Sequence, residues 1–223
     1  IMIYDVKNKK FELSKYLNFK RWYASAVITG DQKMLLFGGV DRSISEGHIP
    51  STIPEIIDLN NIDQGWQSLT QSESSKLFGN INNQREWSYP RAFLASDGNI
   101  VGISYNKLWI MDVNNDYRTT VTGEIPLVKS GISRIEEHEN PNFKNSETEN
   151  LKLLTIGSAV GDTNSALMID KDKVLVFGGK QVGKEYSPSN KVFLIDFTDS
   201  FNPKIKELKS MSYARSNANA TIM

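Results

Sequence analysis

A repeated sequence unit constrains the fold of this chain more than any other feature. The unit is a short apolar run that ends in Asp and is followed by one further apolar residue. It occurs four times, at residues 3–6, 56–59, 110–113 and 194–197. The aspartates are separated by 53, 54 and 84 residues. An internal period of this length predicts a fold assembled from similar supersecondary units.

A second unit precedes three of these copies. It consists of an apolar run, a polar turn and another apolar run that twice ends in a glycine pair, Gly38-Gly39 and Gly178-Gly179. In the middle copy, Gly102-Ile103 is expected to occupy the position of the pair. A weaker strand is expected after each Asp unit, for example at residues 11–13, 66–69 and 205–208.

The residue types in these runs favour strands. The runs are short, rich in β-branched and aromatic residues, and bounded by turns of Asp, Gly and Asn, which is typical of β-hairpins. No segment shows a sustained apolar period of 3.6 residues, so little helix is expected. The paired glycines are expected to end the second strand of each unit, where backbones crowd and a residue without Cβ is tolerated.

About four strands at a period near 50 residues is typical of a kelch-type β-propeller blade. We therefore predict an all-β fold, a partial kelch-type β-propeller with about three full four-stranded blades plus two incomplete ones. An ordinary β-sandwich with chance glycine pairs is the alternative. The predicted boundaries are 1–20 for the end of a blade, 21–80 for a blade, 85–128 for a blade, 129–154 for a polar loop insertion, 155–210 for a blade and 211–223 for the start of the next.

The blade count predicts further blades. A propeller closes with typically 4–8 blades, so the remaining ones are expected from the same polypeptide or from another chain. The 223 residues are accordingly expected to be a piece of a longer polypeptide.

Composition excludes several function classes. Lys plus Arg and Asp plus Glu both number 26, so no net field would attract nucleic acid and none is predicted as a partner. The sequence has no Cys and only two His, His48 and His138, which excludes disulfides, Cys–zinc sites and multi-histidine metal sites within these residues. No apolar run approaches the roughly 18–20 residues that a membrane span requires, and no targeting segment is visible.

Several motifs have ordinary structural interpretations. Residues 178–184 resemble a phosphate-binding loop, but Glu185 follows where that loop needs Ser or Thr, so a blade hairpin is predicted. His138 is predicted to lie at a solvated loop tip. The glycosylation pattern at residues 219–221 is expected to lie in a strand and to be a coincidence.

Three aspartates in the hairpin turns could suggest acid–base catalysis. These residues, Asp31, Asp97 and Asp172, recur at one place in the unit. Because Asp commonly accepts hydrogen bonds from the backbone of its own turn, turn formation is the predicted role of all three.

One segment carries a family resemblance. Residues 21–26, which begin Arg21-Trp22-Tyr23, followed by residues 35–39, resemble the galactose oxidase and glyoxal oxidase group of copper radical oxidases. Tyr89-Pro90 ahead of residues 93–98 looks like the next blade of the glyoxal oxidase branch, and residues 174–179 and 213–215 look like later blades. The catalytic domain of that family is a seven-bladed kelch-type propeller.

The resemblance implies a role for Tyr23. The family's tyrosine at this position binds copper and is cross-linked to a cysteine from the preceding blade, while a Tyr-His pair and a further His from later blades complete the site. The implied activity is oxidation of an alcohol or aldehyde by O₂ to give H₂O₂, in a secreted or cell-surface protein. These 223 residues contain neither the cysteine nor the Tyr-His pair, and one phenolate is not a copper site.

Two other functions remain open on the sequence. A non-enzymatic kelch propeller would present loops 41–54, 71–86 and 129–150 to a protein or glycan partner. A structural propeller within a larger assembly is the second. In either case Tyr23 would be an aromatic side chain that fills the blade interface beside Trp22.

Overall fold

The structure is a computed structural model, and it describes residues 2–13, 15–41, 49–81, 84–126, 128–129, 157–158, 164–179 and 188–222. Three four-stranded antiparallel sheets dominate it. Their strands are β3 (Trp22–Ile28), β4 (Lys33–Val40), β5 (Glu55–Asp58) and β6 (Gln67–Ser68); β9 (Arg91–Leu94), β10 (Ile100–Ser104), β11 (Lys107–Asp112) and β12 (Arg118–Glu124); and β15 (Asn164–Asp170), β16 (Lys173–Gly178), β17 (Val192–Asp196) and β18 (Lys204–Glu207).

Each of these sheets is a meander in which strands adjacent in sequence pair antiparallel. Two-stranded pairs complete the sheet structure: β1 (Met2–Asp5) with β2 (Lys10–Leu13), β7 (Asn80–Ile81) with β8 (Gln84–Arg85), and β13 (Val128–Lys129) with β14 (Gly157–Ser158). The described helices are η2 (Ile62–Gln64), η3 (Thr70–Ser72) and α1 (Ser75–Phe78). The all-β prediction is therefore confirmed. Among the described helices, none is long and apolar enough to cross a membrane.

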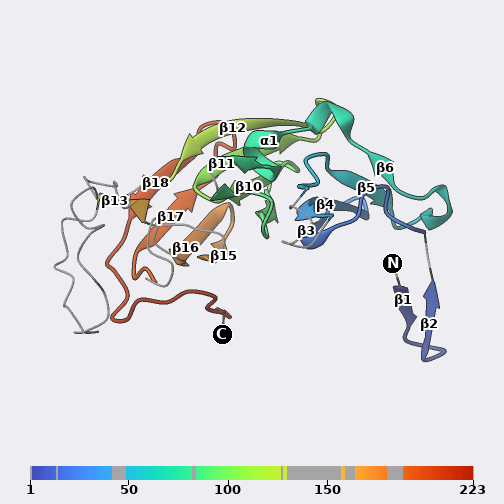
Figure 1. Ribbon diagram of the computed structural model, residues 1–223, viewed down its shortest axis with the longest axis horizontal. Helices are drawn as coiled ribbons and strands as arrows, with labels where there is room; N and C mark the ends of the chain where they lie inside the picture. Colours follow the sequence, from blue (N-terminus) through green and yellow to red (C-terminus); the bar gives the residue numbers. More distant parts are fainter. Residues whose placement is uncertain are drawn as a thin grey trace, which may run out of the picture.

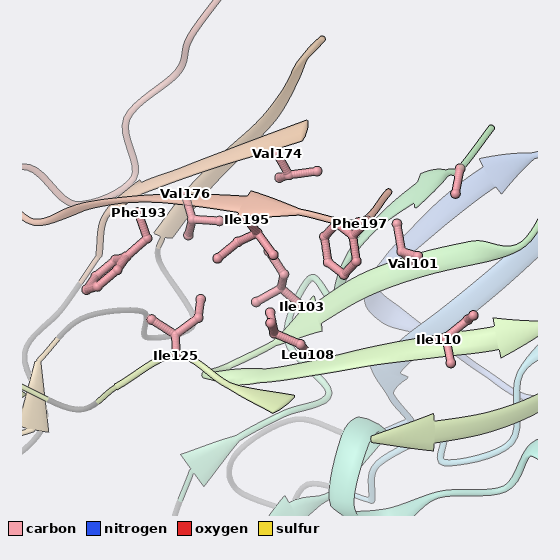
Figure 2. Close-up of a cluster of buried hydrophobic side chains, with 11 residues drawn as sticks. Val101, Ile103, Leu108, Ile110, Ile125, Val174, Val176, Phe193, Ile195 and Phe197 are labelled. Atoms are coloured by element: carbon pink, nitrogen blue, oxygen red, sulfur yellow. The ribbon is translucent and has the colours of Figure 1, made fainter. Parts of the chain in front are cut away.

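Neighbouring sheets lie side by side along an arc (Figure 1). One apolar cluster joins the β9–β12 sheet to the β15–β18 sheet, and the side chains of β10 and β11 face those of β16 and β17 across it (Figure 2). A second cluster joins the β3–β6 sheet to the opposite face of the β9–β12 sheet. Because a twisted sheet with two apolar faces must be covered on both, this stacking buries surface that no single sheet could bury.

The repeated aspartates end β1, β5, β11 and β17. The carboxylate Oδ1 accepts a hydrogen bond from the backbone N–H two residues later at all four positions, with distances of 2.9 Å at Asp5, 2.8 Å at Asp58, 3.0 Å at Asp112 and 2.9 Å at Asp196. The repeat therefore encodes the turn that directs the chain into the fourth strand.

The two glycine pairs form the same joint, each with a segment that follows later in the chain. Gly38 and Gly39 have φ of 62° and 84°, and Gly178 and Gly179 have φ of 68° and 95°. A Cβ on Gly38 would lie 2.5 Å from the carbonyl oxygen of Trp87, and a Cβ on Gly178 would lie 2.5 Å from that of Arg215. The expected crowding of backbones is thus present at both pairs.

The same carbonyls accept hydrogen bonds in these joints. Gly39 N–H donates to Trp87 O over 2.7 Å, and Gly179 N–H donates to Arg215 O over 2.8 Å. Trp87 precedes β9, so the first joint ties the end of β4 to the segment that leads into the next sheet.

The prediction for the middle glycine was wrong by two residues. Counting from the hairpin turn, the pair corresponds to Ser104-Tyr105, where Tyr105 has φ of 57°. Here β10 turns directly into β11, with Ser104 opposite Lys107, whereas a long connection follows both glycine pairs. Gly102 has a different role, because a Cβ there would lie 2.1 Å from the ring of Trp109.

Residues 71–86 are not simply a polar loop. The segment contains α1, β7 and β8, and its Leu77 and Phe78 belong to the cluster between the first two sheets. Its Ser72 and Glu86 are buried as well. Sequence spacing alone missed this because three apolar residues in a segment of Ser, Asn and Gln carry no periodic signal.

Other predictions lie outside the described residues. His48, His138, Lys184, residues 180–187 of the phosphate-loop-like segment, and residues 130–154 of the predicted insertion belong to this group.

Candidate functional site

Four aromatic side chains meet where the first strands of two neighbouring sheets begin. Tyr23 stacks on Trp22 with ring centroids 4.1 Å apart and an interplanar angle of 28°. Its ring lies 4.9 Å from Tyr89 and 6.3 Å from Trp87. Trp87 is buried, Tyr23 is half-buried, and Trp22 and Tyr89 are 52% and 40% exposed. We call Trp22, Tyr23, Trp87 and Tyr89 the aromatic cluster.

Backbone hydrogen bonds fix the aromatic cluster across the boundary between sheets. The N–H of Tyr89 donates to the carbonyl of Tyr23 over 2.9 Å. The glycine joint holds the carbonyl of Trp87 beside it. Sequence reasoning placed Trp22 and Tyr23 at the start of a blade and Tyr89 ahead of the next blade, but it missed Trp87. The available signal was its spacing, because Trp87 precedes Tyr89 by two residues as Arg21 precedes Tyr23.

The left-handed backbone of Tyr23 is a property of the repeat. Its φ is 67°, which is uncommon for a residue other than glycine. Tyr89 has φ of 48° and Asn217 has φ of 52°. They stand two residues after Trp87 and Arg215, whose carbonyls accept the hydrogen bonds of the two glycine joints. Strained residues often mark functional sites, but here the same conformation recurs at three equivalent positions of the chain.

Arg21 has a structural role that its hydrogen bonds define. Its Nε donates to Glu55 over 2.7 Å, and its Nη1 and Nη2 donate to the carbonyls of Gly38, Ser51 and Ile53. Both side chains of the Arg21–Glu55 ion pair are buried, at 1% and 0% exposure. Burial lowers the pKa of the guanidinium, and the hydrogen bond and charge of Glu55 oppose that effect.

A pocket of about 350 Å³ lies beside this ion pair. Its wall includes Asn18, Lys20, Asp41 and residues 49–53. Asn18 N–H donates to Glu55 over 2.6 Å, and the Ser51 hydroxyl donates to Lys20 O over 2.8 Å. The ion pair therefore holds in place the described part of loop 41–54, which forms one side of the pocket.

The described residues do not form a complete copper site. No group of three or more His, Cys, Asp or Glu side chains that could hold a metal lies in that part of the chain. In the aromatic cluster, the groups that could bind a metal are the phenol oxygens of Tyr23 and Tyr89. One or two phenolates without imidazole or thiolate ligands do not make the sites that copper prefers.

The turn aspartates divide into two kinds. Asp97 accepts from the N–H of Asn99 over 2.9 Å, as predicted, and Asp31 accepts from the Thr29 hydroxyl and pairs with Lys33 over 2.8 Å. The prediction was wrong for Asp172. That residue stands one position later in its turn, is 4% exposed, and accepts from the Ser96 N–H over 2.7 Å and from the Ser96 hydroxyl. Asp172 therefore links the hairpin turns of two neighbouring sheets.

The glycosylation pattern at residues 219–221 was assigned to a strand, and this was wrong. These residues are exposed and lie in irregular structure after the last described strand.

The comparisons support the fold. Neither the family models nor the curated proteins contain a match to this sequence. Among solved structures, the chain is similar to a "novel fungal alcohol oxidase with catalytic diversity among the AA5 family, in complex with copper", with a TM-score of 0.69 and 15% sequence identity. The match covers 100% of this chain and 40% of that protein. The chain therefore has the all-β fold of part of that oxidase, and it spans about two fifths of its length.

Proposed function

We propose that the chain is part of a kelch-type propeller in a galactose/glyoxal-oxidase-like protein, with full blades at 21–80, 85–128 and 155–210. Residues 1–20 and 211–223 then belong to two further blades. The fold shared with a copper-containing alcohol oxidase supports this assignment, as do the three four-stranded sheets, two of which carry the same glycine joint after their second strand.

In this proposal Tyr23 is a copper ligand and the centre of a tyrosyl radical in the whole protein. The observation that carries it is the environment of the phenol, half-buried and stacked on the indole of Trp22 at 4.1 Å. A ring shielded in this way is partly protected from solvent, whereas Trp22 and Tyr89 beside it are exposed. The remaining ligands would come from outside the described residues. The copper centre would supply oxidation of an alcohol or aldehyde by O₂ in a secreted or cell-surface protein.

Copper titration of the full-length protein tests the proposal. Wild-type protein is expected to bind copper and to develop the optical absorption of a tyrosyl radical. Tyr23→Phe is expected to weaken copper binding and abolish the radical absorption. Tyr89→Phe is the matched control, because its ring lies in the same aromatic cluster, and it is expected to retain both. Copper binding and radical absorption that are unchanged in Tyr23→Phe would refute the role of Tyr23.

A second function is favoured by the pocket beside Arg21. A binding propeller that recognises a protein or glycan through its loops would use such a surface, and residues 49–53 of loop 41–54 form its wall. Binding to an array of glycans, compared between wild type and Thr52→Trp, tests this function. Loss of a bound glycan in the variant would support it, and a wild type that binds no glycan would count against it.

A further inference from the structure

The hairpin formed by β1 and β2 exposes apolar side chains that the other sheets bury. Met2, Phe11 and Leu13 are 68%, 69% and 70% exposed, and Tyr4 is 48% exposed. The hairpin lies apart from the β3–β6 sheet (Figure 1). Its rings of Tyr4 and Phe11 contact one another at 4.9 Å. An isolated two-stranded sheet is marginally stable in water, so this surface requires a partner.

The position of β1 within the repeat specifies that partner. β1 ends at Asp5, which forms the same turn as Asp58, Asp112 and Asp196 at the ends of β5, β11 and β17. β2 pairs with β1 as the fourth strand of each sheet pairs with the third. The hairpin is therefore equivalent to the outer half of a four-stranded sheet.

The equivalent strands are paired on both edges. β5, β11 and β17 pair on their second edge with β4, β10 and β16. In the described part of the chain, β1 pairs only with β2. The burial differs accordingly, because most residues of β5, β11 and β17 are buried whereas three of the four residues of β1 are exposed.

We propose that the free edge and faces of the β1–β2 hairpin bind an antiparallel β-hairpin, the first two strands of a further blade supplied by the same polypeptide. The inference rests on the assignment of the sheets as blades and not on copper. The share of the related oxidase that this chain spans, 40%, leaves room for such a segment. Strand addition at an exposed edge satisfies the unpaired backbone groups and covers the apolar side chains together.

The register of the four-stranded sheets predicts which residue types the strand that pairs with β1 carries. Lys33 lies opposite Asp58 and Lys173 lies opposite Asp196, each followed by an apolar residue, Met34 or Val174. The occupying strand is therefore expected to place a polar residue opposite Asp5 and an apolar residue opposite Tyr4.

Hydrogen exchange in the full-length protein tests the proposal. In an antiparallel strand, alternate amides point to opposite edges, so the amides of β1 that face away from β2 report on the occupant. They are expected to exchange as slowly as those of β5. Tyr4→Asp is expected to accelerate exchange in β1 by about 10- to 100-fold, because it destabilises local pairing. Val121→Asp, at a comparably exposed position on β12, is expected to leave β1 unchanged.

Two outcomes would overturn the inference. Rapid exchange of those amides in the full-length wild type would show that the edge is unoccupied. Protection that rises with protein concentration, together with a dimer in sedimentation, would show that a second copy is the occupant. Neither outcome alters the copper titration of Tyr23, so failure here is distinguishable from failure of the proposed oxidase.

Discussion

At the scale of single residues, Gly38 combines a left-handed backbone with a close approach to another segment. Gly98 has a left-handed backbone too, with φ of 89°, but a Cβ there would meet nothing within 4 Å. A substitution at Gly98 therefore measures only the cost of the left-handed backbone, whereas one at Gly38 adds the cost of a steric clash.

Gly98→Ala is expected to destabilise the protein by about 1–2 kcal/mol, the cost of a side chain at positive φ. Gly38→Ala is expected to cost about 1–3 kcal/mol more, because its Cβ meets the carbonyl of Trp87. Urea unfolding of both variants measures the difference. Equal decreases in the free energy of unfolding would mean that the backbone at the glycine joint shifts to accommodate the Cβ at no cost.

The Arg21–Glu55 pair is expected to behave as a buried ion pair. Glu55→Gln leaves a buried guanidinium without its counter-charge and should cost about 3–5 kcal/mol. The control is Glu207→Gln, which removes the partner of Lys191 in a more exposed pair of 2.6 Å and should cost at most about 1 kcal/mol. Thermal unfolding of the two variants compares them, and a small loss in Glu55→Gln would contradict the assigned role of Arg21.

Asp196 gives a prediction for pH. The hydroxyl and backbone N–H of Thr198 donate to its carboxylate and lower its pKa below the ordinary value of about 3.9. Because the folded pKa is depressed, the ionised carboxylate stabilises the fold above about pH 4, and this contribution is lost as the pH falls through the folded pKa.

Asp196→Ala should therefore be less stable than wild type near neutral pH, by at most about 1 kcal/mol. The difference should shrink as the pH falls below about 4. Chemical denaturation across that range measures it, with Asp196→Asn as the variant whose stability should lack the same pH dependence. A difference that is constant with pH would refute the role of the charge.

At the scale of elements, Asp172 connects two hairpins that belong to different sheets. Asp172→Asn is expected to cost about 1–3 kcal/mol, because it weakens buried bonds to the Ser96 turn. Asp97→Asn, whose bond stays within its own turn, should cost less than about 1 kcal/mol. Differential scanning calorimetry of both variants would decide between them, and equal costs would contradict a link between hairpins.

The sequence predicted elements well where each residue pattern is local. Alternating runs and Asp turns identified the second and third strands of each full sheet, because hairpin chemistry depends on neighbours in the chain. Patterns that depend on partners distant in sequence failed. Ser104-Tyr105 could not be recognised as the counterpart of a glycine pair, since only the tight turn into β11 explains its residue types.

The candidate site shows the same division. Tyr23 could be singled out from Arg21-Trp22-Tyr23, but the meeting of Tyr23 with Trp87 and Tyr89 depends on two sheets packing side by side. Likewise, the sequence predicts Asp172 to be a turn residue, and only the packing of two sheets brings Ser96 against it.

At the scale of the whole molecule, the β9–β12 sheet holds the other two full sheets together. Adjacent residues of β11 point to its opposite faces, with Trp109 in the cluster toward β3–β6 and Ile110 in the cluster toward β15–β18. Both side chains are fully buried.

Trp109→Ala is expected to cost about 3–5 kcal/mol and Ile110→Ala about 2–5 kcal/mol. Hydrogen exchange should show that the two variants lose stability on opposite faces of the β9–β12 sheet. Trp109→Ala should accelerate exchange mainly in β4 and β5, and Ile110→Ala mainly in β16 and β17. Identical exchange patterns in the two variants would instead show that the three sheets open as one cooperative unit.

The joints at the glycine pairs also bear on how such proteins diverge. The hydrogen bond in each joint runs from a glycine N–H to a main-chain carbonyl, once at Trp87 and once at Arg215, so a large indole and a guanidinium stand at the same point of the architecture. Because both groups of this hydrogen bond belong to the main chain, it does not depend on the side chain of the residue that accepts it. The residues around each joint can therefore change without loss of its hydrogen bond, and a fold joined in this way is compatible with sequences as different as those at 15% identity.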